Sequence, residues 1–451
     1  MLDNFRYDIA FYYEFEVSAM TKASVTVFNQ QLLAFLDASP TPFHAVSLMA
    51  TRLEEQGFKA LSEADVWGEL TSGSYYVTRN NSSLIAFNLP ESNLAETGFN
   101  ILGAHTDSPC LKVKPQAERV RHNLMQLGVE VYGGALLNPW FDRDLSMAGR
   151  VSYIDSKQNI KQTLVDFNKA VATLPSLAIH LDREANKNRT INAQQHLPVI
   201  IMQDQGESNS FRDVLLAQVK QQSPALDIAK VLDYEISLYD TQTAAITGLN
   251  DDFISSARLD NLLSCYAGLA ALLASDKTQA SLLVCSDHEE VGSVSTSGAQ
   301  GSFLASVLMR LCPDTEPYQQ MCHHSILISA DNAHAIHPNY AEVHDPEHSP
   351  KLNQGLVIKT NANQRYATNS DTSAYFRQLC AKVNVSVQDF VVRTDMGCGS
   401  TIGPMTSSAL GIKTIDIGVP TFAMHSIREL AGSQDTYMLR TVLIQFFNQT
   451  N

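Results

Sequence analysis

The sequence predicts an α/β fold: a mixed sheet flanked by helices, with an inserted β-rich domain. Three observations lead to this fold class. Short apolar runs typical of buried strands alternate with amphipathic helical patterns after residue 247. From about residue 113 to 246, short strand candidates instead alternate with turn residues. The chain of 451 residues is long enough for two or three domains and a large core.

The change of pattern along the chain predicts where the domains begin and end. Residues 21–112 and 247–451 form one discontinuous domain, and residues 113–246 are inserted into it. Residues 1–20 mix aromatic and acidic side chains, without the basic start and unbroken apolar core of a secretory signal. Because Met20-Thr21-Lys22 resembles a second start, we expect residues 1–20 to be an extension; the alternative is an ordered N-terminal arm.

Hydrophobic spacing predicts the individual elements. Residues 27–57 have helical spacing that Ser39-Pro40-Thr41-Pro42 interrupts, which predicts a second helix near Pro42. The predicted strands of the main domain are 74–77, 83–87, 99–104, 281–285, 325–329 and 414–418. The predicted later helices are 261–274, 302–311 and 372–383. In the inserted domain, 128–132 and 149–154 are strand candidates.

Composition excludes several classes of function. The formal net charge of −15 argues against nucleic acid as a partner. No apolar run approaches the roughly 20 residues that span a bilayer, so we expect no membrane partner. The seven cysteines are odd in number and form no CxxC pair, which favours reduced thiols in a cytoplasmic protein.

Imidazole and carboxylate groups follow the predicted strands of the main domain. His105 ends one strand, Glu289 and Glu290 follow the next, Asp331 follows a third, and His425 lies a short loop beyond a fourth. Asp260 opens the helix 261–274. Sites of open α/β sheets form at the carboxyl ends of the strands. We therefore expect these side chains to converge at one edge of the sheet.

Two imidazoles and three carboxylates suit a pair of zinc-like divalent ions, since zinc accepts both kinds of ligand. The predicted ligands are His105, Asp260, Glu290, Asp331 and His425, with Asp260 as the bridge. Glu289, adjacent to a ligand, is the predicted general base for a water activated by the ions. Asp107, two residues beyond His105, could orient that imidazole.

Each of these residues also has an ordinary structural interpretation. Taken singly, a polar side chain at a strand end is more often a surface or capping group, and Asp260 could be a helix N-cap. His288-Glu289-Glu290 matches only the first two letters of HExxH. The position four beyond His288 is Gly292, which excludes a zincin helix.

With these residues in place, the chain from about Val25 onward resembles the aspartyl aminopeptidase family of dinuclear zinc peptidases. The segments that carry the resemblance are Ser39-Pro40-Thr41-Pro42-Phe43-His44, Gly103-Ala104-His105-Thr106-Asp107-Ser108-Pro109, Tyr132-Gly133-Gly134, Ala257-Arg258-Leu259-Asp260-Asn261, His288-Glu289-Glu290-Val291-Gly292-Ser293, the run 329–340, Gln364-Arg365-Tyr366-Ala367, the run 398–404 and Ala423-Met424-His425-Ser426-Ile427-Arg428-Glu429. Together they are highly specific.

The resemblance implies a zinc-peptidase-like catalytic domain, a dimerisation domain at residues 113–246, and roles residue by residue. One ion would be held by His105, Asp260 and Asp331, and the other by Asp260, Glu290 and His425, with Glu289 as base. The ions, two per subunit, would be zinc, with cobalt or manganese as alternatives. The implied substrate contacts are His334, Lys359, Tyr366 and, reaching a neighbouring subunit's active site, His180.

The resemblance also implies the reaction and the assembly. The substrates would be peptides with an acidic N-terminal residue, Asp or Glu, which Lys359 or Arg365 could pair with. The assembly would be a dimer-based homo-oligomer, a tetrahedral dodecamer. Two alternatives are a broad-specificity aminopeptidase and a related zinc deacylase. A non-catalytic scaffold is disfavoured, because the base and every ligand position are filled.

Overall fold

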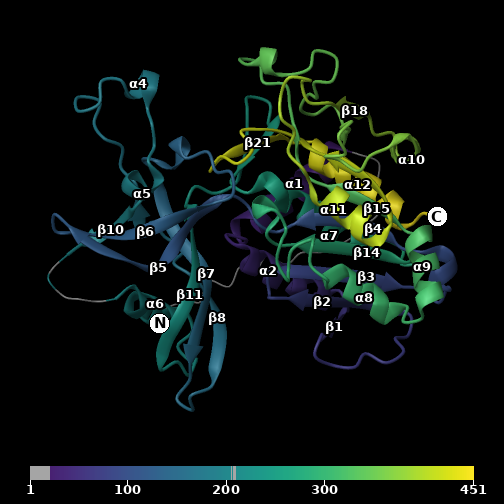
Figure 1. Cartoon of the computed structure of the whole chain (residues 1–451), viewed down its shortest axis with the longest axis horizontal. Helices are drawn as coiled ribbons and strands as arrows, with labels where there is room; N and C mark the ends of the chain where they lie inside the picture. Colours follow the sequence, from purple (N-terminus) through teal and green to yellow (C-terminus); the bar gives the residue numbers. More distant parts are fainter. Residues whose placement is uncertain (1–20, 205, 207–209, 451) are drawn as a thin grey trace.

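The computed structural model describes residues 21–204, 206 and 210–450. The predicted extension, residues 1–20, lies outside these described residues. Two lobes lie side by side: a helix-covered sheet on the right of Figure 1 and a β-rich lobe on the left. The predicted fold class, a mixed sheet flanked by helices with a β-rich insertion, is confirmed.

The right-hand lobe is built on a nine-stranded mixed sheet in the order β1-β2-β3-β14-β4-β15-β19-β17-β18. Its four central strands are parallel and pair in register. They consist almost entirely of buried residues, as the apolar runs of the sequence predict for strands covered on both faces. The strands are β1 (Lys59–Leu61), β2 (Gly73–Arg79), β3 (Ser83–Leu89), β4 (Asn100–His105), β14 (Ser281–Ser286), β15 (Ile326–Ala330), β17 (Leu356–Lys359), β18 (Val387–Phe390) and β19 (Lys413–Gly418).

Helices cover both faces of this sheet. On one face the apolar core is closed by α1 (Lys22–Asp37), α2 (Pro42–Glu55), α7 (Leu259–Ala274), α10 (Ser370–Lys382) and α12 (Asp435–Phe447). On the other face lie α3 (Leu94–Thr97), α8 (Phe303–Leu311), α9 (Thr315–His324) and α11 (Ile402–Leu410). Pro42 occupies the first position of α2, where its missing N–H costs nothing. This proline explains why the helical pattern of residues 27–57 divides into two helices.

The left-hand lobe is a β-barrel. β11 pairs with β5 on one side and β7 on the other, so six strands close a ring, and β8 pairs with β7 outside it. The strands are β5 (Cys110–Arg121), β6 (Leu124–Tyr132), β7 (Asp144–Ile154), β8 (Ile160–Asp166), β9 (Ala172–Thr173), β10 (Val199–Gln203) and β11 (Lys230–Asp240). The lobe also carries η1 (Asn138–Trp140), α4 (Ala185–Asn188), α5 (Ala193–His196) and α6 (Phe211–Gln222). The domain boundaries at residues 113 and 246 stay predictions.

A third, five-stranded sheet adjoins the main sheet in the order β12-β13-β21-β20-β16. Its strands are β12 (Ala245–Thr247), β13 (Phe253–Ser256), β16 (Ala333–His334), β20 (Pro420–Phe422) and β21 (Glu429–Gly432). Two short 3-10 helices, η2 (Glu289–Val291) and η3 (Ala341–Val343), complete the elements. In the part of the chain that the structure describes, no helix is both long enough and apolar enough to cross a membrane.

Candidate metal centre

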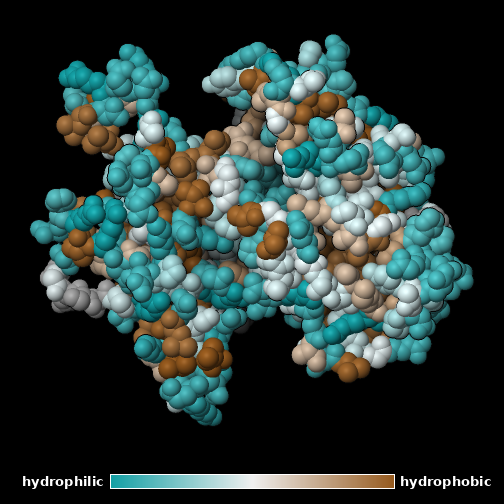
Figure 2. All heavy atoms as spheres, in the orientation of Figure 1, coloured by the Kyte–Doolittle hydropathy of each residue, from teal (hydrophilic) through white to brown (hydrophobic). Residues whose placement is uncertain are grey.

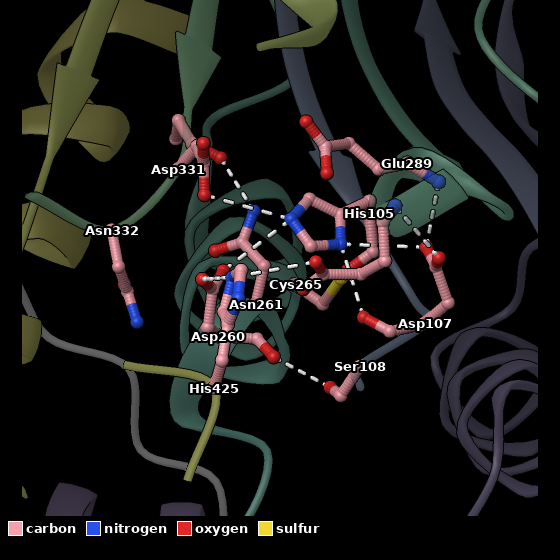
Figure 3. Close-up of polar contacts among 12 residues, drawn as sticks. His105, Asp107, Ser108, Asp260, Asn261, Cys265, Glu289, Asp331, Asn332 and His425 are labelled. Atoms are coloured by element: carbon pink, nitrogen blue, oxygen red, sulfur yellow. Dashed lines mark hydrogen bonds and ion pairs between the residues drawn. The ribbon is translucent and has the colours of Figure 1, made fainter. Parts of the chain in front are cut away.

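The polar residues predicted at the strand ends do converge. His105 is the last residue of β4, Asp331 follows β15 directly, and Glu289 and Glu290 lie in η2 after β14. Asp260 lies in the first turn of α7, and His425 in the loop between β20 and β21. Figure 3 shows the side chains of Asp260, Asp331, Glu289 and His425 gathered around His105. The parallel arrangement of β14, β4, β15 and β19 explains this convergence.

A first cluster consists of His105, Asp260 and Asp331. The His105 Nε2 atom lies 3.4 Å from Asp260 Oδ1 and 3.5 Å from Asp331 Oδ1. His105 and Asp260 are buried, and only 14% of the Asp331 side chain is exposed. These three groups offer one nitrogen and two oxygens within 4.8 Å of one another, which is a donor set suited to a divalent ion.

A second cluster consists of Asp260, Glu290 and His425. The His425 Nε2 atom lies 3.5 Å from Asp260 Oδ2 and 3.3 Å from Glu290 Oε2. Asp260 therefore turns one carboxylate oxygen to each cluster. A third group, His105 with Glu289 and Glu290, also meets the 4.8 Å limit. The distances alone therefore do not decide whether Glu289 is a metal ligand or only lies beside the ligands.

Two buried carboxylate oxygens without hydrogen-bond donors also indicate that these residues fit divalent ions. Asp260 Oδ1 and Glu290 Oε1 are buried and, within the described residues, receive no hydrogen bond. A buried carboxylate oxygen without a donor is costly unless a cation compensates it. Both oxygens belong to predicted ligands, and they are of the kind that zinc accepts.

Electrostatics indicates the same need for positive charge. Burial, reinforced by the carboxylates of Asp331 and Asp260 and opposed by His105, raises the pKa of Glu289 to about 7. Burial, and after it the Asp260 carboxylate, also raises the pKa of Glu290. Burial alone would lower the pKa of His105, but the three carboxylates at its ring raise it well above its usual range. The cluster carries more negative charge than its own side chains neutralise.

Asp107 contacts both His105 and the backbone of Glu289 and Glu290. His105 Nδ1 lies 3.0 Å from the Asp107 backbone carbonyl oxygen and 3.4 Å from Asp107 Oδ1, so both the backbone and the carboxylate of this residue face the imidazole. The same carboxylate accepts hydrogen bonds from the backbone N–H groups of Glu289 and Glu290, both at 3.1 Å. The Tyr132 hydroxyl, at the end of β6, donates to Asp107 Oδ2 at 2.7 Å. The barrel therefore supports the position of this carboxylate.

His425 is held by the segment that follows β6. Its Nδ1 lies 3.3 Å from the Gly134 carbonyl oxygen, which can accept a proton from that nitrogen and leave Nε2 free to bind a metal. The Leu136 N–H donates to the His425 carbonyl at 3.0 Å. The His425 N–H in turn donates to Glu429 Oε1 at 2.8 Å. These contacts fix a residue whose loop has no regular structure.

Lys359 lies deep beside the first cluster. Its Nζ is 3.2 Å from Asp331 Oδ2 and donates to the Asn332 carbonyl at 3.1 Å, and the residue is only 2% exposed. Burial opposes ionisation of Asp331, but the Lys359 ammonium and then His105 outweigh it and lower the pKa of Asp331. Lys359 is thus a counter-ion of a predicted ligand in this structure, and its contact with substrate stays a prediction.

The other predicted substrate contacts lie at different depths. Tyr366 is buried, and Lys359 Nζ lies 5.3 Å from its ring centre. His334 contributes to a cavity of about 300 Å³ that Phe390, Phe422 and Met424 also line. Desolvation and the Lys359 ammonium lower the pKa of His334. His180 lies exposed in the barrel lobe, between β9 and α4, and no contact joins it to the five predicted ligands in the described chain.

The structure adds residues to which sequence reasoning gave no role. Glu429 and Tyr132 act through the backbone or through Asp107, as described above. Asn332 is buried beside Asp331, and its side-chain amide has no partner among the described residues. All three lie inside the sequence motifs that carry the family resemblance, so the sequence indicated that these segments matter. Only their contacts reveal what they do.

Comparison with known proteins agrees with this geometry. A family model described as aminopeptidase I zinc metalloprotease (M18) matches residues 35–447. A probable M18 family aminopeptidase 2 of Azotobacter vinelandii is 57% identical over 423 residues, which cover 94% of this chain and 98% of that protein. A protein of the same description from Pseudomonas fluorescens is 57% identical over 421 residues, covering 93% and 97%.

Solved structures share the fold over nearly the whole chain. The cryo-EM structure of the Ape4 and Nbr1 complex matches with a TM-score of 0.91 and 37% identity, covering 95% of this chain and 87% of the other. The structure of the S. cerevisiae mApe1 dodecamer matches with a TM-score of 0.83 and 28% identity, covering 94% and 97%.

Proposed function

Since the chain belongs to the M18 family of aminopeptidase I zinc metalloproteases, a family of metal-dependent peptide hydrolases, we propose that it removes the N-terminal residue of peptides. The proposed mechanism uses two metal ions and Glu289 as the general base. The observation that carries the two-metal part is the position of Asp260. One of its oxygens faces His105 and the other faces His425. A carboxylate placed in this way is suited to bridge two ions.

The proposed ligands divide into two overlapping sets. His105, Asp260 and Asp331 hold one ion, and Asp260, Glu290 and His425 hold the other. Zinc suits these nitrogen and oxygen donors, and cobalt or manganese are alternatives. When bound, such ions polarise the scissile carbonyl and lower the pKa of a water molecule towards about 7.

Glu289 supplies the proton transfers. It is not needed to complete either ligand set, and burial makes its carboxylate more basic than an exposed glutamate. Asp107 fixes its backbone N–H, so that its side chain approaches the site from η2. In the proposed reaction Glu289 takes a proton from the attacking water and delivers it to the leaving amine. His334, which lines the neighbouring cavity, is proposed as a donor to the developing oxyanion.

The preferred N-terminal residue is the part of the proposal with two candidates. The family resemblance favours an acidic residue, with which Lys359 or Arg365 could pair. One observation favours a broader specificity: Lys359 is already paired with Asp331 and almost fully buried. Comparing cleavage of aspartyl, glutamyl and leucyl chromogenic amides separates the two candidates.

We also propose a homo-oligomer based on dimers, with the dodecamer as its final form. The S. cerevisiae relative is described as a dodecamer. In this chain, Leu177, Ile179 and Leu181 expose 61%, 47% and 74% of their surface next to His180. Figure 2 shows apolar side chains on this projecting arm, which Figure 1 marks by α4. Burying them against a second copy would carry His180 towards the partner's active site.

Further proposals concern the domains and the compartment. The segment 113–246 would act as the dimerisation domain, and residues 21–112 with 247–451 as the catalytic domain. All seven cysteines are free thiols, which supports a reducing compartment such as the cytoplasm.

The central test is the variant Glu289→Gln. It keeps the size of the side chain and removes its basicity, so kcat should fall by about 10²–10⁴-fold while both ions stay bound. Metal analysis of the same sample is the second measurement. Glu55→Gln, at the exposed end of α2, is the control and should leave kcat unchanged. Turnover at the parental rate would remove Glu289 from the mechanism.

A further inference from the structure

We propose that Glu429 is a positioning residue for the second metal: it holds Asp260 and His425 by their backbone amides and so sets the affinity for the ion that these two residues share. The proposal rests on the ligand sets proposed above. Glu429 itself points no oxygen at the cluster; it acts through the two ligands. It begins β21 in the five-stranded sheet and is 2% exposed.

The contacts of Glu429 use both oxygens of its carboxylate. Oε1 accepts the His425 N–H at 2.8 Å, and Oε2 accepts the Asp260 N–H at 2.9 Å. Because one rigid carboxyl group receives both N–H groups, it fixes the position of one ligand backbone relative to the other.

Both amides need such a partner. Asp260 lies in the first turn of α7 with non-helical angles, φ −84° and ψ 105°, so its N–H has no acceptor in the helix. His425 has a φ of +68°, a left-handed conformation that is unfavourable for a residue with a side chain. Such a conformation persists only where the surroundings impose it. The bonds to Glu429 and from Leu136 are what impose it here.

Asp107 shows the same device on the opposite side. Its carboxylate accepts the N–H groups of Glu289 and Glu290, as that of Glu429 accepts those of Asp260 and His425. Both residues line one cavity of about 40 Å³, together with residues of β5 and β11 of the barrel. Two buried acids thus hold the backbones of four residues of the proposed centre. Asp107 also faces a ligand ring, whereas Glu429 acts on backbone alone.

The test compares Glu429→Gln with a matched control. Asp435, at the start of α12, is also a buried acid whose two oxygens accept backbone N–H groups, from Asn353 at 2.6 Å and Gly355 at 3.3 Å. It contacts none of the proposed ligands. Asp435→Asn therefore removes a similar support without touching the centre.

Zinc affinity is measured for each protein by competition with a chromogenic chelator. In Glu429→Gln the second ion should bind about 10–100-fold more weakly, while the first is retained. Activity should return when free zinc is raised to saturation, with the KM for peptide unchanged. Asp435→Asn should bind both ions with parental affinity even where its melting temperature falls. If the glutamine variant does not accumulate, Glu429→Asp, which keeps the charge but shortens the reach, should show the same selective weakening.

Two results would overturn the proposal, and they differ. If the parental protein binds two ions and Glu429→Gln binds both with equal affinity, Glu429 is structural only and the proposed function stands. If the parental protein itself binds a single ion, the proposed ligand sets fail, and the role of Glu429 fails with them.

Discussion

The two halves of the proposed metal centre are built in different ways. His105 and Asp331, in the first half, stand at the ends of β4 and β15, which pair in parallel register. Glu290 and His425, in the second half, lie on η2 and on a loop. The side chain of His425 is 31% exposed, whereas that of His105 is 2% exposed. The sheet therefore positions the first half, and hydrogen bonds between loops position the second.

The halves also differ in how their charge is balanced. The first half has its own cation, because Lys359 Nζ lies 3.2 Å from Asp331. The second half has no lysine or arginine ion pair on Glu290 among the described residues, and burial raises the pKa of that group. The first half is therefore preorganised by the protein, whereas the second relies on the contacts from Glu429 and the barrel and, in the proposed two-metal centre, more on its ion.

The largest effect should come from the residue that both halves share. Asp260→Ala removes the bridging carboxylate, so both ions should be lost and kcat/KM should fall by roughly 10³-fold or more. His425→Ala is the matched variant and should lose only the second ion. Metal analysis after dialysis measures both. Equal metal loss in the two variants would contradict the division into halves.

An intermediate effect should come from the counter-ion of the first half. Lys359→Met leaves the buried Asp331 carboxylate uncompensated, which should cost about 3–5 kcal/mol of unfolding free energy in metal-free protein. Bound zinc should reduce this loss, because it supplies the missing positive charge. Urea unfolding with chelator and with zinc makes the measurement.

The control for this variant is an exposed ion pair. Lys413→Met breaks the contact with Asp371 on the surface and should change stability by no more than about 1 kcal/mol. A loss in Lys359→Met that is the same with and without zinc would show that Asp331 takes no part in metal binding.

The smallest effect should come from the barrel's contribution. Tyr132→Phe removes the hydroxyl that donates to Asp107, and activity should fall by about tenfold. Tyr234→Phe is the control, because that hydroxyl donates to the Lys114 carbonyl within the barrel, away from the centre. Steady-state kinetics at limiting and saturating zinc should show a larger defect at limiting zinc. Equal kinetics for the two variants would argue that the barrel does not support the centre.

Much of the fold was predictable because the pattern of apolar residues is local. The runs 281–285, 325–329 and 414–418 became β14, β15 and β19 to within a residue or two. Pro42 marked the start of α2 correctly. The barrel's closure was not predictable, because it depends on β11 pairing with both β5 and β7, and such pairing leaves no signal in either strand alone.

Residue types and motifs were enough to indicate which imidazoles and carboxylates follow the strands and to which family the chain belongs. The tertiary structure decided what those groups meet. The family resemblance implies a substrate contact for Lys359, and the fold places its ammonium against Asp331. Glu429 is one residue of a sequence motif, but the fold turns one of its oxygens to the amide of Asp260, which is far away in the sequence, and the other to the amide of nearby His425. The physical reason is that a donor set is a property of residue types, whereas a hydrogen bond requires atoms within about 3 Å, which only packing creates.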